Sequence, residues 1–378
     1  MNAYKLVRYF SRSISCIAFA ACAAAGLVPG LAQAQEEKVL NIYNWSDYVA
    51  EDTIANFEKE TGIKVRYDTY DNNEILHAKL VAGKTGYDIV VPSSTFARLQ
   101  IDGGLLMKLD KAQLPNLKNL DPDIQAQIAT IDPGNQYLVN WLWGYTTIGI
   151  NTAKVKVALG GEAMPANVWE LFFNPKYASK LKSCGISVLD SASEVLPAAL
   201  HYLGKDSFSK SSADYQEALA LLKSVRPYVT LFSSSGYINE MASGSICVAL
   251  GWNGDINIAR ARALEGKTGQ DVVALVPKIG GMLFFDMMAI TADAPHPKNA
   301  MLFMNYIMRP EVHAALTNKV KYANPNKESR KFISPEVASN PSVFPGSAEM
   351  ALMVPPKALS NDIRRLQTRT YTSFKTGL

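Results

Sequence analysis

The sequence predicts an α/β protein with two lobes. Apolar runs typical of buried strands alternate with helical patterns from residue 39 onward, which is the order expected of a parallel sheet with helical crossovers. The chain has 378 residues, more than one ordinary core requires, so two lobes are expected. Apolar residues make up 48% of the chain and charged residues 19%, as in folded globular proteins.

The first lobe is predicted to begin with alternating strands and helices. Gly62 and Gly83 each follow an amphipathic run and mark the end of a helix. In chain order, the predicted elements are a strand over residues 39–42, a helix over 50–61, a strand over 64–70, a helix over 73–82, a strand over 87–91 and a helix that reaches residue 102.

The chain is expected to pass into the second lobe near residues 137–150 and to return near 277–281. The predicted elements are a helix over residues 122–130, strands over 137–143 and 146–150, a helix over 167–173, a strand over 184–189, helices over 193–203 and 213–225, a strand over 246–250, a helix over 256–264, strands over 272–276 and 282–290, and helices over 296–308 and 311–319. We therefore predict that residues 35–139 and 278–333 form lobe 1, and that residues 140–277 and 334–378 form lobe 2.

Residues 1–34 are predicted to be a secretory signal peptide. A basic start is followed by an apolar run over residues 14–28 and by Ala32-Gln33-Ala34, a small-x-small cleavage site with Ala34 as the last residue removed. A membrane anchor is the alternative, but the run is short and is interrupted by Gly26 and Pro29. We expect the mature protein to be exported and soluble.

The charge of the chain argues against nucleic acid as a partner. The formal net charge is +4, and Lys5, Arg8 and Arg12 lie in the signal segment, which contains no acid. Removing these three charges leaves +1, which gives no basic field for nucleic acid or for an acidic membrane surface.

Two cysteines remain after export. Cys16 and Cys22 leave with the signal segment, and Cys184 and Cys247 stay in the mature chain. Two cysteines in an oxidising compartment are expected to form one disulfide, and two buried free thiols are the alternative.

The chain lacks the motifs of common catalytic and cofactor sites. It contains no Gly-x-Ser-x-Gly elbow, no His-Glu-x-x-His, no P-loop and no Gly-x-Gly-x-x-Gly. Its four histidines are scattered, and none stands beside a paired carboxylate or a cysteine. We therefore predict no catalytic residue, no metal site and no cofactor.

Aromatic and acidic residues recur together at predicted strand ends. The groups are Trp45 with Asp47 and Tyr48, Trp252 with Asp255, and Phe284 with Asp286, and Glu194 adds an acid after a fourth strand. Buried carboxylates usually have a cation for partner, and aromatic rings attract the same charge. If these loops converge, a ligand with an amine at each end and methylenes between them completes the site. Each group also has a structural explanation, in which Asp47 caps the following helix and the rings pack in the core.

Longer runs of the sequence carry a family resemblance. These runs are Tyr43-Asn44-Trp45-Ser46-Asp47-Tyr48, Asn56-Phe57-Glu58-Lys59-Glu60-Thr61-Gly62, Leu203-Gly204-Lys205-Asp206, residues 246–255 and residues 303–310. In this order they resemble the periplasmic substrate-binding proteins of ABC polyamine importers, and most closely the putrescine-binding members. The resemblance implies a type II periplasmic binding protein fold, with two α/β lobes, a hinge and a ligand cleft between the lobes.

The resemblance also implies which residues line the cleft. Lobe 1 would contribute Trp45, Ser46, Asp47, Tyr48 and Ser93, lobe 2 would contribute Glu194, Trp252 and Asp255, and the hinge and returning segment would contribute Phe284, Asp286 and Tyr322. Asp286, with Tyr48 nearby, would hold one amine, and Glu194 or Asp255 would hold the other. Trp45, Trp252 and Phe284 would enclose the methylenes. Cys184 and Cys247 match positions that form a disulfide in the putrescine-binding relatives.

The resemblance implies that the protein captures a polyamine, with putrescine as the first expected ligand, by closing its cleft. It would act in the periplasm as a monomer and deliver the ligand to an inner-membrane ABC permease. Phe284 stands where spermidine-preferring relatives tend to carry Trp, and Ser191 where they tend to carry an acid. Thr95 departs from close putrescine binders, so spermidine, cadaverine and agmatine stay open as ligands. The rival functions are a sensor of the same ligand and, on the acids and rings alone, a glycoside-acting enzyme.

Overall fold

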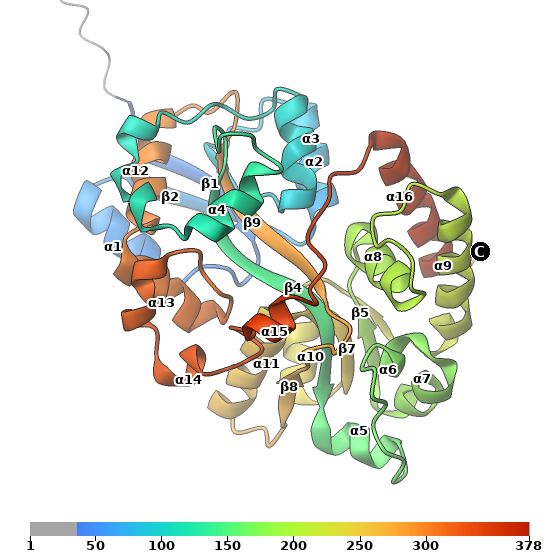
Figure 1. Ribbon diagram of the computed structural model, residues 1–378. Helices are drawn as coiled ribbons and strands as arrows, with labels where there is room; N and C mark the ends of the chain where they lie inside the picture. Colours follow the sequence, from blue (N-terminus) through green and yellow to red (C-terminus); the bar gives the residue numbers. More distant parts are fainter. Residues whose placement is uncertain (1–35, 378) are drawn as a thin grey trace, which may run out of the picture. The chain divides into compact units, whose positions relative to one another are not determined.

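The computed structural model describes residues 36–377, so the predicted signal segment lies outside the described residues (Figure 1). The described chain forms one mixed sheet with helices packed around it. The strands follow the order β2-β1-β3-β9-β4-β7-β5-β6, and β8 pairs with β4. Their bounds are Val39–Trp45 (β1), Lys64–Tyr70 (β2), Ile89–Val90 (β3), Val139–Asn151 (β4), Ile186–Val188 (β5), Leu231–Phe232 (β6), Val248–Trp252 (β7), Val272–Ala274 (β8) and Met282–Ile290 (β9).

Two long strands, β4 and β9, join the halves of this sheet. In one half β1 pairs in parallel with β2 and β3, and β3 pairs antiparallel with β9. In the other half β5 pairs in parallel with β6 and β7, and β7 pairs antiparallel with β4. Because β4 and β9 also pair with each other, they form the connection between the halves. We call the half built on β1–β3 lobe 1 and the half built on β5–β7 lobe 2.

Sixteen α-helices lie in the described residues. Those that pack with lobe 1 include α1, α2, α3, α12 and α13, and those that pack with lobe 2 include α5 to α11 and α16. Their bounds are Glu51–Thr61 (α1), Asn73–Ala82 (α2), Ser94–Asp102 (α3), Pro122–Ala129 (α4), Thr152–Ala158 (α5), Glu170–Phe173 (α6), Pro175–Leu181 (α7), Ala192–Tyr202 (α8), Ser212–Val225 (α9), Tyr237–Ser243 (α10), Asn253–Glu265 (α11), Pro297–Ile307 (α12), Pro310–Val320 (α13), Pro335–Ala338 (α14), Ser347–Met350 (α15) and Asn361–Thr376 (α16).

Three predicted elements recur with unchanged bounds, namely the strands over 64–70 and 282–290 and the helix over 73–82. The prediction of two strands over 137–143 and 146–150 is wrong, because β4 runs unbroken through Gly144. A Cβ on Gly144 would lie 2.5 Å from Asn253 Oδ1 and 2.9 Å from Phe284 Cζ. The glycine therefore allows neighbouring side chains to approach the strand closely and does not mark a turn.

Several described elements have no counterpart among the predicted ones. They are α5, α7, α10, α14, α15, α16 and the two-residue strand β6. In α16 the buried positions include the polar residues Gln367 and Thr370 beside Tyr371 and Phe374, so its apolar pattern is weak in the sequence. None of the helices between residues 36 and 377 is both long and apolar enough to cross a bilayer.

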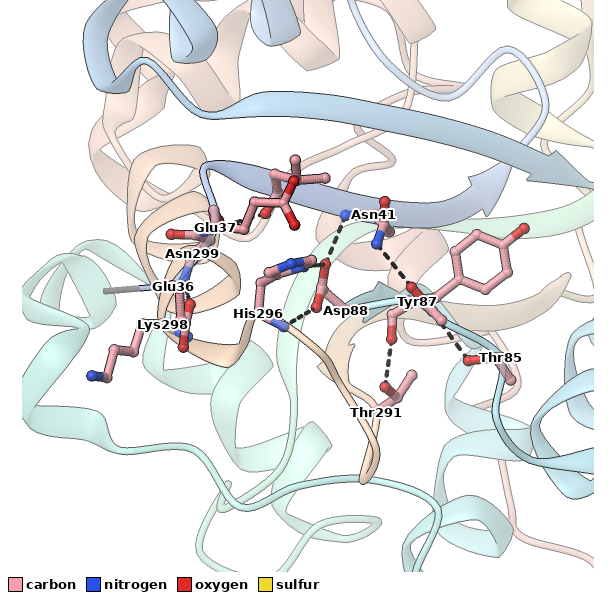
Figure 2. Close-up of polar contacts among 12 residues, drawn as sticks. Glu36, Glu37, Asn41, Thr85, Tyr87, Asp88, Thr291, His296, Lys298 and Asn299 are labelled. Carbon is pink, nitrogen blue, oxygen red and sulfur yellow. Dashed lines mark hydrogen bonds and ion pairs between the residues drawn. The ribbon is translucent and has the colours of Figure 1, made fainter. Parts of the chain in front are cut away.

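Polar contacts join β1 and the residues before it to α12 and to the segment before β3 (Figure 2). Both carboxylate oxygens of Glu36 accept backbone N–H bonds at the start of α12, from Lys298 and Asn299, each at 3.0 Å. The fully buried carboxylate of Asp88 accepts from the backbone N–H of Asn41 at 2.7 Å and from that of His296 at 2.5 Å. These bonds join β1, the segment before β3 and α12 in lobe 1.

Candidate ligand-binding cavity

A small cavity lies where the two lobes meet. Its walls come from the loop after β1, the ends of β2, β3 and β7, the first turn of α11, the middle of β9 and the segment after α13. The lining residues are Trp45, Ser46, Tyr48, Tyr70, Asp71, Ser93, Ser234, Ser235, Ile238, Trp252, Asp255, Phe284, Asp286 and Tyr322. Nine of the eleven predicted site residues are among them.

Asp286 has a buried carboxylate that accepts hydrogen bonds from two hydroxyl groups. Ser93 Oγ donates to Oδ1 at 2.5 Å, and Tyr48 Oη donates to Oδ2 at 2.7 Å. The residue is 3% exposed. Burial raises the pKa of Asp286 to about 7, and the hydrogen bonds from Ser93 and Tyr48 oppose this rise.

Asp255, on α11, has a matching environment. Tyr322 Oη donates to Oδ1 at 2.6 Å, and Tyr237 Oη donates to Oδ2 at 3.0 Å. The residue is 7% exposed, and burial raises the pKa of Asp255 to about 7 against the effect of these two bonds. Burial also raises the pKa of Tyr322 and Tyr237 well above that of an ordinary tyrosine, so both hydroxyls remain donors.

Aromatic rings cover the space between the two carboxylates. Trp45 and Trp252 meet edge to face with ring centroids 5.6 Å apart, and Tyr48 and Tyr322 meet in the same way at 5.0 Å. The indole N–H of Trp45 donates to the carbonyl of Val91 at 2.9 Å, which fixes this ring against the end of β3. Aromatic faces arranged in this way attract a cation and pack against methylenes.

The cavity is acidic and has no basic side chain of its own. Among its lining residues are three carboxylates, Asp71, Asp255 and Asp286, and no Lys, Arg or His. Asp71 accepts a hydrogen bond from Ser46 Oγ at 3.0 Å. A buried carboxylate without a cationic partner is costly, so the lining favours a ligand that supplies the positive charge.

Two predicted site residues lie outside the lining. Asp47 has a left-handed backbone conformation (φ 55°), and its carboxylate pairs with Arg262 at 2.7 Å, with side chains 40% and 32% exposed. The alternative in which Asp47 caps the next helix is wrong, because Ala50 is the N-cap residue and no side chain bonds there. Glu194 is buried behind the wall, where Thr146 Oγ1 donates to it at 2.5 Å. Burial raises the pKa of Glu194.

One prediction about position also changes. Phe284 and Asp286 were expected at a strand end but lie within β9, where Asp286 pairs with Leu142 of β4. The connecting strands themselves therefore supply part of the cavity wall. The fold brings this mid-strand carboxylate beside Ser93, which follows β3.

Sequence reasoning did not single out Tyr70, Asp71, Ser234, Ser235 and Ile238 as lining residues. Tyr70 ends β2, which is parallel to β1, and carboxyl ends of neighbouring parallel strands meet at one edge of a sheet. That rule could have found Tyr70 and Asp71. The other three follow the two-residue strand β6, which has no clear sequence signal.

The predicted disulfide between Cys184 and Cys247 is confirmed, with the Cα atoms 5.5 Å apart. It joins the segment before β5 to the segment before β7 in lobe 2.

Two α/β lobes joined by long shared strands, with an acidic and aromatic cavity at their junction, define a solute-binding protein. Residues 52–345 match the family described as bacterial extracellular solute-binding proteins, and the chain belongs to this family. The expectations of a type II periplasmic binding protein fold and of a binding protein rather than an enzyme are confirmed by this membership and by the relatives below.

The relatives are similar over nearly their whole length. The chain is 46% identical to the putrescine-binding periplasmic protein SpuD of Pseudomonas aeruginosa, over 93% of this chain and 96% of the relative. It is 47% identical to the putrescine-binding periplasmic protein PotF of Escherichia coli, over 91% and 93%. The structure of a putative spermidine/putrescine ABC transporter from Listeria monocytogenes matches with a TM-score of 0.81 at 30% identity, over 90% of this chain and 100% of that one. The sequence resemblance is thereby confirmed.

Proposed function

We propose that this protein captures a polyamine, with putrescine as the first ligand, and delivers it to an ABC importer in the inner membrane. The observation that carries this proposal is the pair of buried carboxylates, Asp286 and Asp255, each of which accepts side-chain hydrogen bonds from two hydroxyl groups and pairs with no cationic side chain in the described residues. A short aliphatic chain with an ammonium at each end matches two carboxylates separated by aromatic rings. The names of the two curated relatives support the same ligand class.

Capture would follow from the way in which the two carboxylates are distributed. Asp286 belongs to the connecting strand β9 and is bonded by lobe 1 residues, whereas Asp255 belongs to α11 of lobe 2. A ligand with an amine bound to each carboxylate favours the closed state, in which Asp286 and Asp255 line the same cavity. The closed state is then populated because the ligand binds it more tightly than the open state. No covalent step is needed.

Calorimetry on the mature protein, freed of ligand by unfolding and refolding, tests this function. We expect one-to-one binding of putrescine, with cadaverine, agmatine, spermidine and spermine in the same panel to define the preference. Asp286→Asn and Asp255→Asn should each weaken binding by about 2–5 kcal/mol, the usual effect of removing one partner of a buried charge pair. The matched control is Asp102→Asn, an exposed carboxylate that pairs with Arg98 away from the cavity. Failure of the wild-type protein to bind any of the five amines would overturn the proposal.

The compartment and the processing belong to the same proposal. The periplasmic names of the relatives support export, and we propose that cleavage follows Ala34 and that the mature chain acts as a monomer with the lobe bounds predicted above. The intact mass of the protein from a periplasmic extract should correspond to a chain that starts at Gln35. A mass that retains residues 1–34 would contradict the cleavage.

A further inference from the structure

Outside the cavity, Glu74 of lobe 1 contacts the beginning of a lobe 2 helix. Glu74 lies in the first turn of α2, and Ser191 is the N-cap residue of α8. The carboxylate of Glu74 accepts the backbone N–H of Ser193 at 3.2 Å and the hydroxyl of Ser191 at 3.3 and 3.4 Å to its two oxygens. One carboxylate therefore bonds two groups on the first turn of a helix from the other lobe.

The first turn of α8 has no side-chain cap from its own chain segment. Ser191 is a residue type that commonly caps a helix, yet its side chain makes no cap bond. Helix N-termini leave backbone N–H groups without partners and carry a partial positive charge, and a carboxylate placed there satisfies both. Glu74 supplies this carboxylate only while the lobes are in contact.

Neighbouring contacts lie on the same rim of the lobe junction. Asn72 Nδ2 donates to the carbonyl of Asp190 at 3.4 Å, also between α2 and the start of α8. Arg364 of α16 lies over the ring of Phe96 at 4.0 Å and donates to the carbonyl of Thr95 on α3. The rim thus joins α2 and α3 of lobe 1 to α8 and α16 of lobe 2.

On the lobe 2 side, this rim is next in sequence to the buried carboxylate of Glu194, which does not itself line the cavity. Glu194 follows Ser193 and accepts a hydrogen bond from Thr146 Oγ1. The first turn of α8 therefore carries both the contact with Glu74 and this buried carboxylate. Glu74 itself does not line the cavity. Of the charged groups around Glu74, Arg364 is attracted to it and Glu194 is repelled by it.

We propose that Glu74 holds the lobes closed by capping α8 across their junction, and that it sets how long a captured ligand stays bound. It is a positioning residue, because it acts on the closed state and not on the ligand. The inference rests on the proposed function and adds to it a determinant of release that is independent of which amine is bound.

Stopped-flow and calorimetry on the full mature protein test the role of Glu74. Glu74→Gln should raise the dissociation rate of putrescine by about 5- to 30-fold, in the range of ordinary coupling between sites, with little change in the association rate. The same fold-increase in dissociation rate is expected for cadaverine, because Glu74→Gln destabilises the closed state and removes no contact with the ligand. Glu51→Gln is the matched control, since Glu51 is an exposed acid that pairs with Lys319 of α13 within lobe 1.

A second pair of variants isolates the helix end. Ser193→Pro removes the N–H that Glu74 accepts, and a proline is tolerated in the first turn of a helix, whereas Ser193→Ala keeps this N–H. Ser193→Pro should reproduce the faster release of Glu74→Gln without adding to it in the double variant, and Ser193→Ala should release more slowly than Ser193→Pro. Additive effects of Glu74→Gln and Ser193→Pro, or an unchanged release rate in Glu74→Gln, would overturn the inference.

A distance measurement distinguishes an error in the role of Glu74 from an error in the proposed ligand. Spin labels at Leu302 of α12 and Val157 of α5, exposed by 53% and 81%, report the separation of the lobes. Glu74→Gln should shift the distance distribution of the ligand-free protein toward the open form, relative to Glu51→Gln. This readout needs no ligand, so it decides the role of Glu74 even if no polyamine binds, and an unchanged distribution contradicts that role.

Discussion

Asp286 and Asp255 are both buried, yet the side chains that bond them are neutral hydroxyls. Hydroxyl donors favour the charged carboxylate, but burial outweighs them and raises the pKa of each residue to about 7. Each carboxyl therefore holds a proton for part of the time near neutral pH when no cation is present. An ammonium beside the carboxylate would lower the pKa and displace this proton.

We predict that polyamine binding releases protons. Because the pKa of both carboxyls is about 7 in the free protein and lower in the complex, affinity should rise with pH up to about 7 and then level off. Calorimetry at pH 6.5 in buffers of small and large ionisation enthalpy should show proton release, and the release should vanish at pH 8.5. Asp286→Asn should reduce the number of protons released. Equal heats in both buffers at pH 6.5 would contradict this linkage.

At the scale of single elements, the first turn of α11 contains two residues, Gly254 and Asp255, that shape the cavity. Gly254 lies in the first turn, directly before Asp255. A Cβ on Gly254 would lie 2.2 Å from ring atoms of Tyr322, so the ring packs directly on the helix backbone. This close approach lets the Tyr322 hydroxyl reach Asp255 at 2.6 Å, and it also lets that oxygen accept the backbone N–H of Asp255 at 3.2 Å.

Gly254→Ala should therefore weaken ligand binding without unfolding the protein. The overpacking is expected to cost about 1–3 kcal/mol of folding stability. The displaced ring also moves the Tyr322 hydroxyl away from Asp255, which lowers the affinity for the ligand. Alanine is the better helix former by about 1 kcal/mol, which offsets part of any loss in folding stability. Calorimetry and thermal melting of the same sample compare the two effects. Unchanged affinity would show that the ring of Tyr322 does not depend on this glycine.

At the scale of the whole molecule, the sequence predicted the residues whose signal is local. The aromatic loop after β1 and the end of β7 were found because each follows a recognisable apolar strand. Ser234, Ser235 and Ile238 were missed because β6 is a strand only through its pairing with β5, about 44 residues earlier in the chain. Asp47 was placed in the cavity because spacing does not reveal the left-handed backbone that directs it to Arg262. The sequence alone therefore did not predict strand pairing between distant residues or the backbone conformation of a loop.

The enclosure of the cavity at the lobe junction has a kinetic consequence for solute exchange. The carboxylates that would hold the amines are at most 7% exposed, so a second solute cannot reach them while the first is in place. Exchange must then wait for spontaneous reopening. In a chase of labelled putrescine by unlabelled putrescine, the rate of loss should be independent of the chase concentration. A rate that grows with that concentration would mean that an incoming solute assists departure, and the protein would act as an exchanger rather than as a trap.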